Sequence, residues 1–216
     1  VLCGGSGEFS DLSPLEVRDI AQAAVAGAKG RCPIVSGIGH ADKTAVSMAQ
    51  AAQDVGCDAV LIMPHKPVIK RGDKAILERH IKIAKAIDIG MVPFRAPSQT
   101  LSIDLVSRFA NMPEVVFIKE ESGAVDWVRS GLRITKNAVP IVTGGGENMV
   151  PYYYLAGAVG FTTGMANITL KESIALHNAA IKSQWTKAMI WRDYFEPLTE
   201  SRRTIGNAML KSGLEM

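Results

Sequence analysis

The sequence predicts an α/β fold of the (β/α)8 TIM barrel type that lacks its first strand–helix unit. Three observations lead to this prediction. Short apolar segments alternate with helix-forming segments along most of the chain, which is typical of a parallel sheet. Each predicted helix is long enough to connect two neighbouring parallel strands by a right-handed crossover. The chain also opens on Val1–Cys3, which resembles the end of a strand already in progress.

The first half of the chain supplies four of the predicted strands. After Val1–Cys3, a helix begins at Ser13, because Ser13, Pro14 and Glu16 form a capping box with proline at the first helical position. That helix stops near Gly30. Apolar runs then predict strands at 33–38, 59–63 and 89–94, with helices at 43–55 and 73–87 between them.

The second half continues the pattern. Four consecutive apolar residues, Val115 to Ile118, predict a strand buried on both faces. Further strands are predicted at 140–143 and 160–163, and helices at 101–111, 125–135 and 148–156. The residues from Leu170 to Met216 exceed what an eighth barrel helix needs. We therefore predict a barrel domain over 1–182 and a C-terminal helical extension over 183–216.

An open, doubly wound parallel sheet is the alternative fold. Such sheets often bind dinucleotides through a G-x-G-x-x-G turn that opens a helix. No such turn opens any of the predicted helices.

Composition narrows the classes of function. The net charge is only +3 and the charges are interspersed, which argues against nucleic-acid or membrane partners. The three cysteines form no C-x-x-C pair and no cluster with histidine, so we expect a reduced, cytoplasmic protein without a metal site. No apolar run approaches the roughly 20 residues of a membrane span.

Lys119 is the main candidate for a catalytic residue. It directly follows the apolar run, and functional groups in parallel α/β folds lie at the carboxyl ends of strands. Burial of a lysine amine favours its neutral form, which is the nucleophile that forms a Schiff base with a carbonyl substrate. The alternative is that Lys119 only pairs with Glu120 or Glu121 where the next helix begins.

Three stretches, each at a different strand end, together indicate a family. They are Gly4-Gly5-Ser6-Gly7-Glu8, Phe94-Arg95-Ala96-Pro97-Ser98-Gln99-Thr100 and Ile118-Lys119-Glu120. Their order and spacing resemble the dihydrodipicolinate synthase / N-acetylneuraminate lyase family of class I aldolases. The similarity covers essentially the whole chain, including Gly160–Asn167.

The resemblance implies roles for several residues. Lys119 would form the Schiff base with the 2-oxo group, and Gly5 and Ser6 would hold the substrate carboxylate. Gly145 would place a backbone carbonyl near the substrate. Because Phe94 replaces the family's tyrosine, protons would have to be relayed by water, a substrate hydroxyl, Ser6, Thr162 or Thr163. The family needs no cofactor or metal, takes small-molecule 2-oxo acids, and commonly assembles as a homotetramer, so we expect a homo-oligomer, either tetramer or dimer.

The chain departs from the family at two positions. Phe94 stands where the family usually has a tyrosine that relays protons, and a phenyl ring has no proton to give. Gln99 stands where synthase members have an arginine for the second substrate's carboxylate. Arg95 lies close by and is either a substitute clamp for an acidic substrate or a surface cation.

These observations together predict a Schiff-base-forming lyase. Its substrate would be a 2-oxo acid, either pyruvate or a 2-oxo-3-deoxy sugar acid, and its reaction an aldol cleavage or a dehydration. The alternatives are a dihydrodipicolinate synthase proper and a non-catalytic paralogue that binds a 2-oxo acid.

Overall fold

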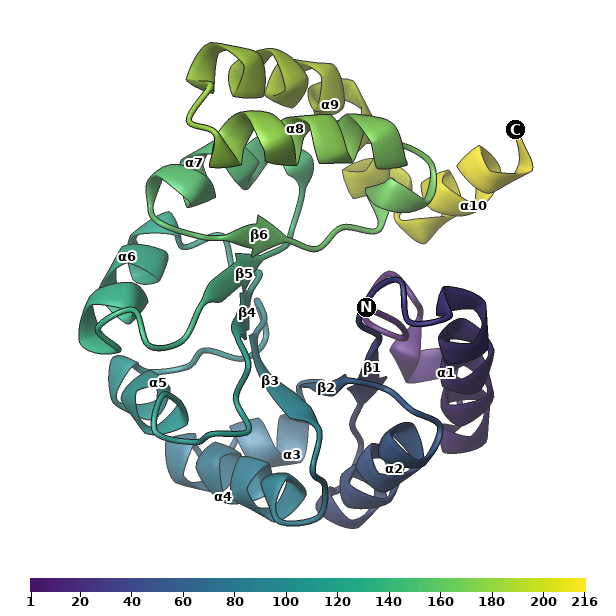
Figure 1. Cartoon of the computed structure of the whole chain (residues 1–216), viewed down its shortest axis with the longest axis vertical. Coiled ribbons are helices and arrows are strands. Elements are labelled where there is room, and N and C mark those ends of the chain that lie inside the picture. The colour runs from purple at the N-terminus through teal and green to yellow at the C-terminus, as the bar shows by residue number, and fades with distance from the viewer.

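The computed structural model describes residues 1–216 and shows a curved parallel sheet with helices on its outside (Figure 1). The six strands follow one another across the sheet in sequence order, and every neighbouring pair is parallel. They are β1 (Val35–Ile38), β2 (Ala59–Ile62), β3 (Gly90–Arg95), β4 (Ile118–Glu120), β5 (Ile141–Thr143) and β6 (Gly160–Phe161). This is the sheet of a partial (β/α)8 barrel, as predicted.

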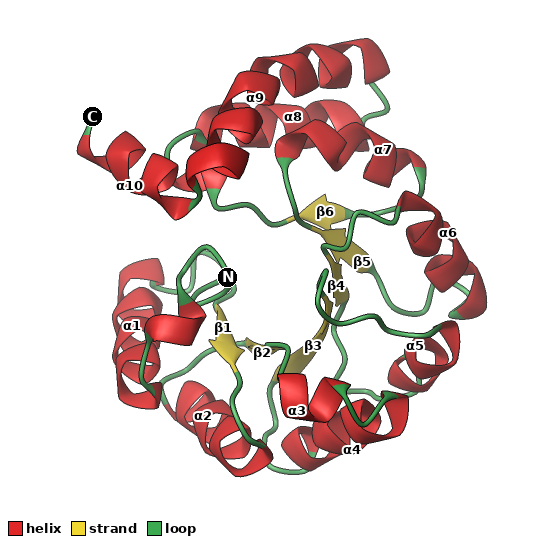
Figure 2. Ribbon diagram, turned by 180° about the vertical axis from the view of Figure 1, so that it is seen from behind, coloured by secondary structure: helices red, strands yellow, loops and turns green.

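The helices between the strands form the outer layer. They are α1 (Pro14–Ala28), α2 (Asp42–Asp54), α3 (Lys66–Ile69), α4 (Asp73–Ala84), α5 (Ile103–Phe109), α6 (Val125–Ile134) and α7 (Val150–Leu155). Three more follow the last strand: α8 (Leu170–Ile181), α9 (Trp185–Ile205) and α10 (Asn207–Glu215). The ring of helices is interrupted between the N-terminal segment and α10 (Figures 1 and 2).

The first helix confirms the capping prediction. The Ser13 N–H donates to Glu16 Oε2 at 2.8 Å, and the Glu16 N–H donates to Ser13 Oγ at 3.3 Å. The N-terminal strand is shorter than predicted. Only Leu2 pairs with the sheet, in an isolated parallel bridge to Ser36.

The strand that carries Lys119 differs from the predicted one. It covers Ile118–Glu120 rather than 115–118, and Val115 makes only an isolated bridge to Met91. Val116 is 45% exposed, so the expectation that this run is buried on both faces is wrong for Val116. The reason is its position at the edge where the strands begin, where its side chain lies over the bare backbone of Gly90.

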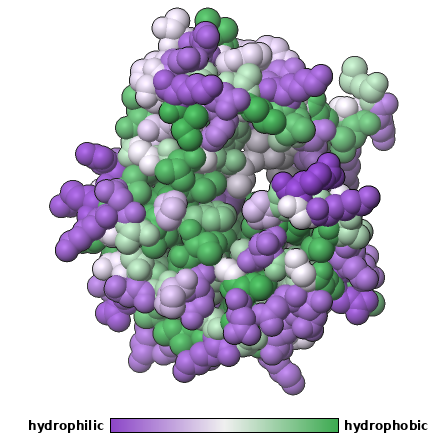
Figure 3. All heavy atoms as spheres, in the orientation of Figure 1, coloured by the Kyte–Doolittle hydropathy of each residue, from purple (hydrophilic) through white to green (hydrophobic).

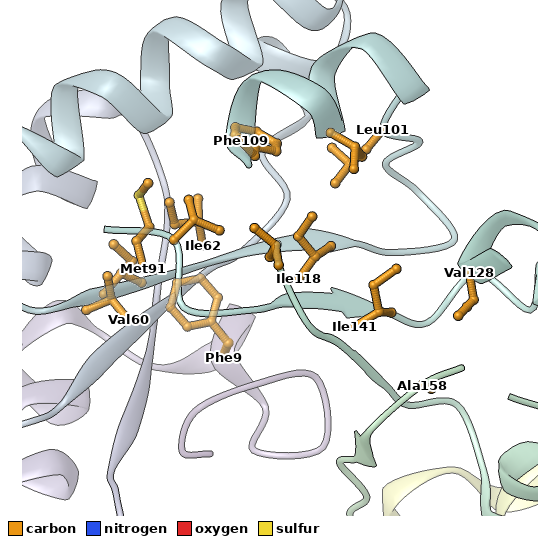
Figure 4. Close-up of a cluster of buried hydrophobic side chains, with 14 of the residues drawn as sticks. Phe9, Val60, Ile62, Met91, Leu101, Phe109, Ile118, Val128, Ile141 and Ala158 are labelled. Carbon is orange, nitrogen blue, oxygen red and sulfur yellow. The ribbon is translucent and has the colours of Figure 1, made fainter. Parts of the chain in front are cut away.

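Side chains alternate between two apolar layers, as the two-residue period of a strand requires. The inner face of the sheet carries a small cluster of buried residues, Val35, Ala59, Leu61, Val92, Phe94 and Ala96. The outer face packs against the helices in the main core. Figure 4 shows part of it, where Val60, Ile62, Met91, Ile118 and Ile141 lie near Leu101 and Phe109 of the helical layer.

The outer surface is mostly hydrophilic where the helices form the rim of the molecule (Figure 3). None of the helices combines the length and the apolar character that a bilayer span requires.

Buried His80 gives the fold an acid-sensitive element. Its ring packs against Phe109 at 4.5 Å between centroids, with the two ring planes tilted by 44°, and its Nδ1 lies 2.7 Å from the Ile76 carbonyl oxygen. Burial disfavours the charged imidazolium and lowers the pKa of His80 from 6.5 to about 4.

We predict that His80→Asn makes stability less dependent on pH. As the pH falls from about 6.5 to 4, the unfolded chain binds a proton that the folded protein excludes. Folding stability is therefore lost over this range, by about 3 kcal/mol from this residue. Urea unfolding between pH 7 and pH 4.5 should show a shallower loss in the variant. Equal slopes in the two proteins would contradict the assignment.

Candidate active site

A cavity of about 680 Å³ lies at the carboxyl ends of the strands. Five parts of the chain line it: the N-terminal glycine turn, the end of β4, the loops that follow β5 and β6, and the last turns of α9. The polar or charged lining residues are Ser6, Lys119, Glu121, Glu147, Thr162, Thr163, Asn167, Thr199, Arg202 and Arg203.

Lys119 faces this cavity because of its register in the sheet. It pairs with Phe94 of β3, whose side chain belongs to the inner cluster, so Lys119 also points inward. The residue is only 7% exposed. Its Nζ lies 2.6 Å from Glu121 Oε2 and 4.2 Å from the centroid of the Phe94 ring. The amine is thus held between a carboxylate and an aromatic face.

Arg95 and Glu120 point the opposite way. They are the next pair in the register, so both face the helical layer. Arg95 Nη1 donates to Glu120 Oε2 at 2.8 Å and also bonds Ser122 Oγ, while the guanidinium stacks 4.6 Å from the Trp127 ring centroid. Arg95 is therefore neither a clamp in the cavity nor a surface cation. It is half of a buried ion pair.

Gln99 also lies outside the cavity lining. It is buried, and its Nε2 donates to the Phe94 carbonyl oxygen at 2.7 Å. Its amide braces the end of β3 and with it the backbone of Phe94. Of the other predicted site residues, Gly5, Ser6, Gly145 and Thr162 do line the cavity beside Lys119.

The glycine turn reaches the cavity because two other glycines give it room. A Cβ on Gly37 would lie 2.1 Å from the Cys3 carbonyl oxygen, so only glycine lets the N-terminal segment cross β1 here. A Cβ on Gly164 would lie 2.6 Å from Ser6 Oγ. Arg202 of α9 donates to the same hydroxyl, which connects the turn to the C-terminal helices.

The sequence analysis named Glu121 only as a pairing partner of Lys119, and the structure shows this ion pair. The place of Glu121 beside Lys119 in the cavity could have been deduced, because side chains two residues apart along an extended strand lie on the same face. No local sequence pattern indicated that Arg202 and Arg203 line the cavity, because they lie on α9, a helix far from Lys119 in the sequence.

Glu147 was also missed. It is fully buried, and Thr163 Oγ1 donates to its Oε1 at 2.5 Å. Burial raises the pKa of Glu147, although the Thr163 hydrogen bond opposes this.

A family model, described as the dihydrodipicolinate synthetase family, matches residues 1–215. The chain belongs to this family. The resemblance predicted from the three strand-end stretches is thereby confirmed, and the members of the dihydrodipicolinate synthetase family are lyases.

Individual relatives carry two different names. A probable 5-dehydro-4-deoxyglucarate dehydratase of Chelativorans sp. (strain BNC1) is 30% identical over 225 residues, covering 99% of this chain and 72% of the relative. A 4-hydroxy-tetrahydrodipicolinate synthase of Methanosphaerula palustris is 28% identical over 202 residues, covering 92% of this chain and 69% of the relative.

The fold is shared with solved members of the family. The crystal structure of dihydrodipicolinate synthase from Oceanobacillus iheyensis superposes with a TM-score of 0.90 at 28% identity, covering 99% of this chain and 72% of that one. The predicted fold class is therefore confirmed.

We predict that Arg95→Ala destabilises the protein by about 3–5 kcal/mol, because it leaves the fully buried carboxylate of Glu120 without its cation. Urea unfolding at pH 7 measures the loss. Exposed Arg129 of α6 provides the matched control, and Arg129→Ala should change stability by no more than about 0.5 kcal/mol. Similar losses in the two variants would mean that the Arg95 ion pair does not stabilise the fold.

Proposed function

We propose that this protein is a lyase that forms a Schiff base between Lys119 and a 2-oxo acid. One observation carries the proposal: the Lys119 amine is buried in a cavity that it shares with the Gly4–Gly7 turn. A Schiff base requires a lysine whose amine reaches a substrate that is shielded from bulk water.

The remaining lining fits an acidic substrate. In the glycine turn, Gly5 and Ser6 offer backbone N–H groups at close approach, and such turns form concave sites for anions. Arg202 and Arg203 add permanent positive charge to the same cavity. We therefore assign the carboxylate of the 2-oxo acid to the glycine turn, and Gly145 and Thr162, which line the same cavity, to other contacts with the bound substrate.

Two features favour a dehydratase or aldolase over a synthase. Gln99 is buried away from the cavity and cannot clamp a second carboxylate there. Phe94 places a hydrocarbon ring, without an acidic proton, beside the amine. We thus favour a 2-oxo-3-deoxy sugar acid as substrate. The name of the dehydratase relative, 5-dehydro-4-deoxyglucarate dehydratase, is that of an enzyme for a deoxy sugar acid with an oxo group. The synthase activity named for other relatives is the alternative.

Three further expectations belong to this proposal. The active protein would be a homo-oligomer, a tetramer or a dimer, in the cytoplasm, with no cofactor. Residues 183–216 would form a helical extension of the barrel domain 1–182. Through Arg202 and Arg203, that extension would contribute to the site.

Trapping with pyruvate and borohydride tests the covalent step. We predict that the protein gains the mass of one reduced pyruvate adduct and that peptide mapping places it on Lys119. Lys119→Ala should lose both this adduct and turnover on 2-oxo-3-deoxy sugar acids, because no other group can replace the amine nucleophile. Exposed Lys74 of α4 is the matched control, and Lys74→Ala should keep both.

Two results would contradict the proposal. One is an adduct on an amine other than that of Lys119. The other is full turnover by Lys119→Ala. An adduct on Lys119 without turnover on any 2-oxo acid tested would instead indicate the non-catalytic paralogue.

A further inference from the structure

Glu121 is the one carboxylate in contact with the Lys119 amine, at 2.6 Å between Oε2 and Nζ. We propose that Glu121 is the proton-transfer residue of this site. It would move protons to and from the amine and then to and from the substrate carbon next to the imine. This inference rests on the proposed function, because it assigns a second residue to the same reaction.

The strand geometry places Glu121 for this role. It follows Lys119 by two positions, and its N–H still donates to the Arg95 carbonyl oxygen at 2.8 Å, so the extended pairing continues through it. Both side chains therefore leave the same face of the sheet. The Glu121 side chain is 32% exposed, which lets its carboxylate exchange protons with water in the cavity.

The loop after β5 leaves space for this carboxylate. A Cβ on Gly144 would lie 2.9 Å from Glu121 Oε2, and one on Gly145 would lie 3.6 Å from its Cγ. A side chain at Gly144 would thus displace the carboxylate from its position beside the amine.

None of the other polar groups of the cavity is a carboxylate in contact with the amine, although Glu147 Oε2 and Thr199 Oγ1 have no hydrogen-bond partner. Glu147 is fully buried and accepts the hydrogen bond from Thr163. The Ser6 hydroxyl is bonded by Arg202. Arginine stays protonated throughout the accessible pH range, so Arg202 and Arg203 cannot act as bases.

The proposed steps form the Schiff base first. Glu121 takes a proton from the Lys119 ammonium, and the neutral amine attacks C2 of the 2-oxo acid. The C=O π electrons go to the oxygen, which becomes a hydroxyl by taking a proton from the attacking nitrogen. Glu121 then returns its proton to that hydroxyl, which leaves as water, and the nitrogen lone pair forms the C=N bond of a protonated imine.

The next steps act on the substrate carbon skeleton. The Glu121 carboxylate removes a proton from C3, and the C–H electron pair becomes the C2=C3 bond while the C=N π electrons return to nitrogen. In a dehydration, the nitrogen lone pair re-forms C=N and the C2=C3 electrons form C3=C4, which expels the C4 hydroxyl. This hydroxyl takes the proton from Glu121 and leaves as water, and hydrolysis of the imine then releases the product. Each proton that Glu121 accepts is thus returned, and no oxidant or reductant is needed.

Hydrogen exchange at the methyl group of pyruvate measures the proton transfer at C3 alone, without the later dehydration or carbon–carbon cleavage. We predict that the protein exchanges the methyl protons of pyruvate for deuterium in D2O, as followed by proton NMR. In Glu121→Gln the exchange rate should fall by about 10²–10⁴-fold, the usual contribution of a general base. Borohydride should still trap pyruvate on Lys119 in this variant after prolonged incubation.

Matched variants make the result specific. Glu121→Asp keeps a carboxylate and should retain more exchange than Glu121→Gln. Exposed Glu78 of α4 lies outside the cavity lining, and Glu78→Gln should exchange at the wild-type rate. Thermal unfolding of each variant verifies that it remains folded.

Three outcomes would overturn the assignment of Glu121 while leaving the Schiff base intact. The first is wild-type exchange by Glu121→Gln. The second is a folded Glu121→Gln that never traps pyruvate, which would make Glu121 a positioning residue for the amine. The third is loss of exchange in Glu147→Gln but not in Glu121→Gln. Absence of trapping on Lys119 in the wild-type protein would instead refute the proposed function itself.

Discussion

The alternation of side chains along β4 is the constraint on which the rest of the site depends. Lys119 and Glu120 end this strand, and Glu121 directly follows it in extended pairing with Arg95. The pleat sends Glu120 outward and Lys119 and Glu121 inward. The outward carboxylate is neutralised by Arg95 within the helical layer. The inward pair forms the centre of the cavity. A shift of the register by one residue would bury an unpaired lysine in the core and break both ion pairs.

The ion pair between Arg95 and Glu120 therefore helps to hold Lys119 and Glu121 in place. Arg95 stands between Glu120, Ser122 and the Trp127 ring, which ties the end of β4 to β3 and to α6. Gln99 adds a second tie at the same place by bonding the Phe94 carbonyl. Because a displacement of about 1 Å can cost a reaction about 100-fold, these buried contacts matter to an amine that must meet a substrate carbon. Arg95 and Gln99, which look like substrate clamps in the sequence, instead hold the ends of the two strands that carry Phe94 and Lys119.

The sequence predicted the fold well because each element carries its own local signal. The capping box at Ser13, the apolar runs and the glycine stops are properties of short segments. The cavity lining followed from the sequence only where it depended on such segments, as for Lys119 and the glycine turn. Arg95 directly follows Phe94, so the sequence alone could have indicated that the two side chains lie on opposite faces of the strand. Its ion-pair partner Glu120 could not be deduced, because it lies on the neighbouring strand. Arg202 depends on how α9 returns over the barrel, which no local pattern encodes.

The ion pair between Lys119 and Glu121 also bears on the energetics of the site. An isolated ammonium in a cavity with so little exposure would be costly, and a carboxylate at 2.6 Å removes most of that cost. In the mechanism proposed above, the same contact is the path by which the amine would pass its proton to Glu121. The stability of the site and its proposed reactivity would thus depend on one ion pair. A substrate whose own carboxylate was held by the glycine turn would bring its carbonyl carbon to this amine without competing for Glu121.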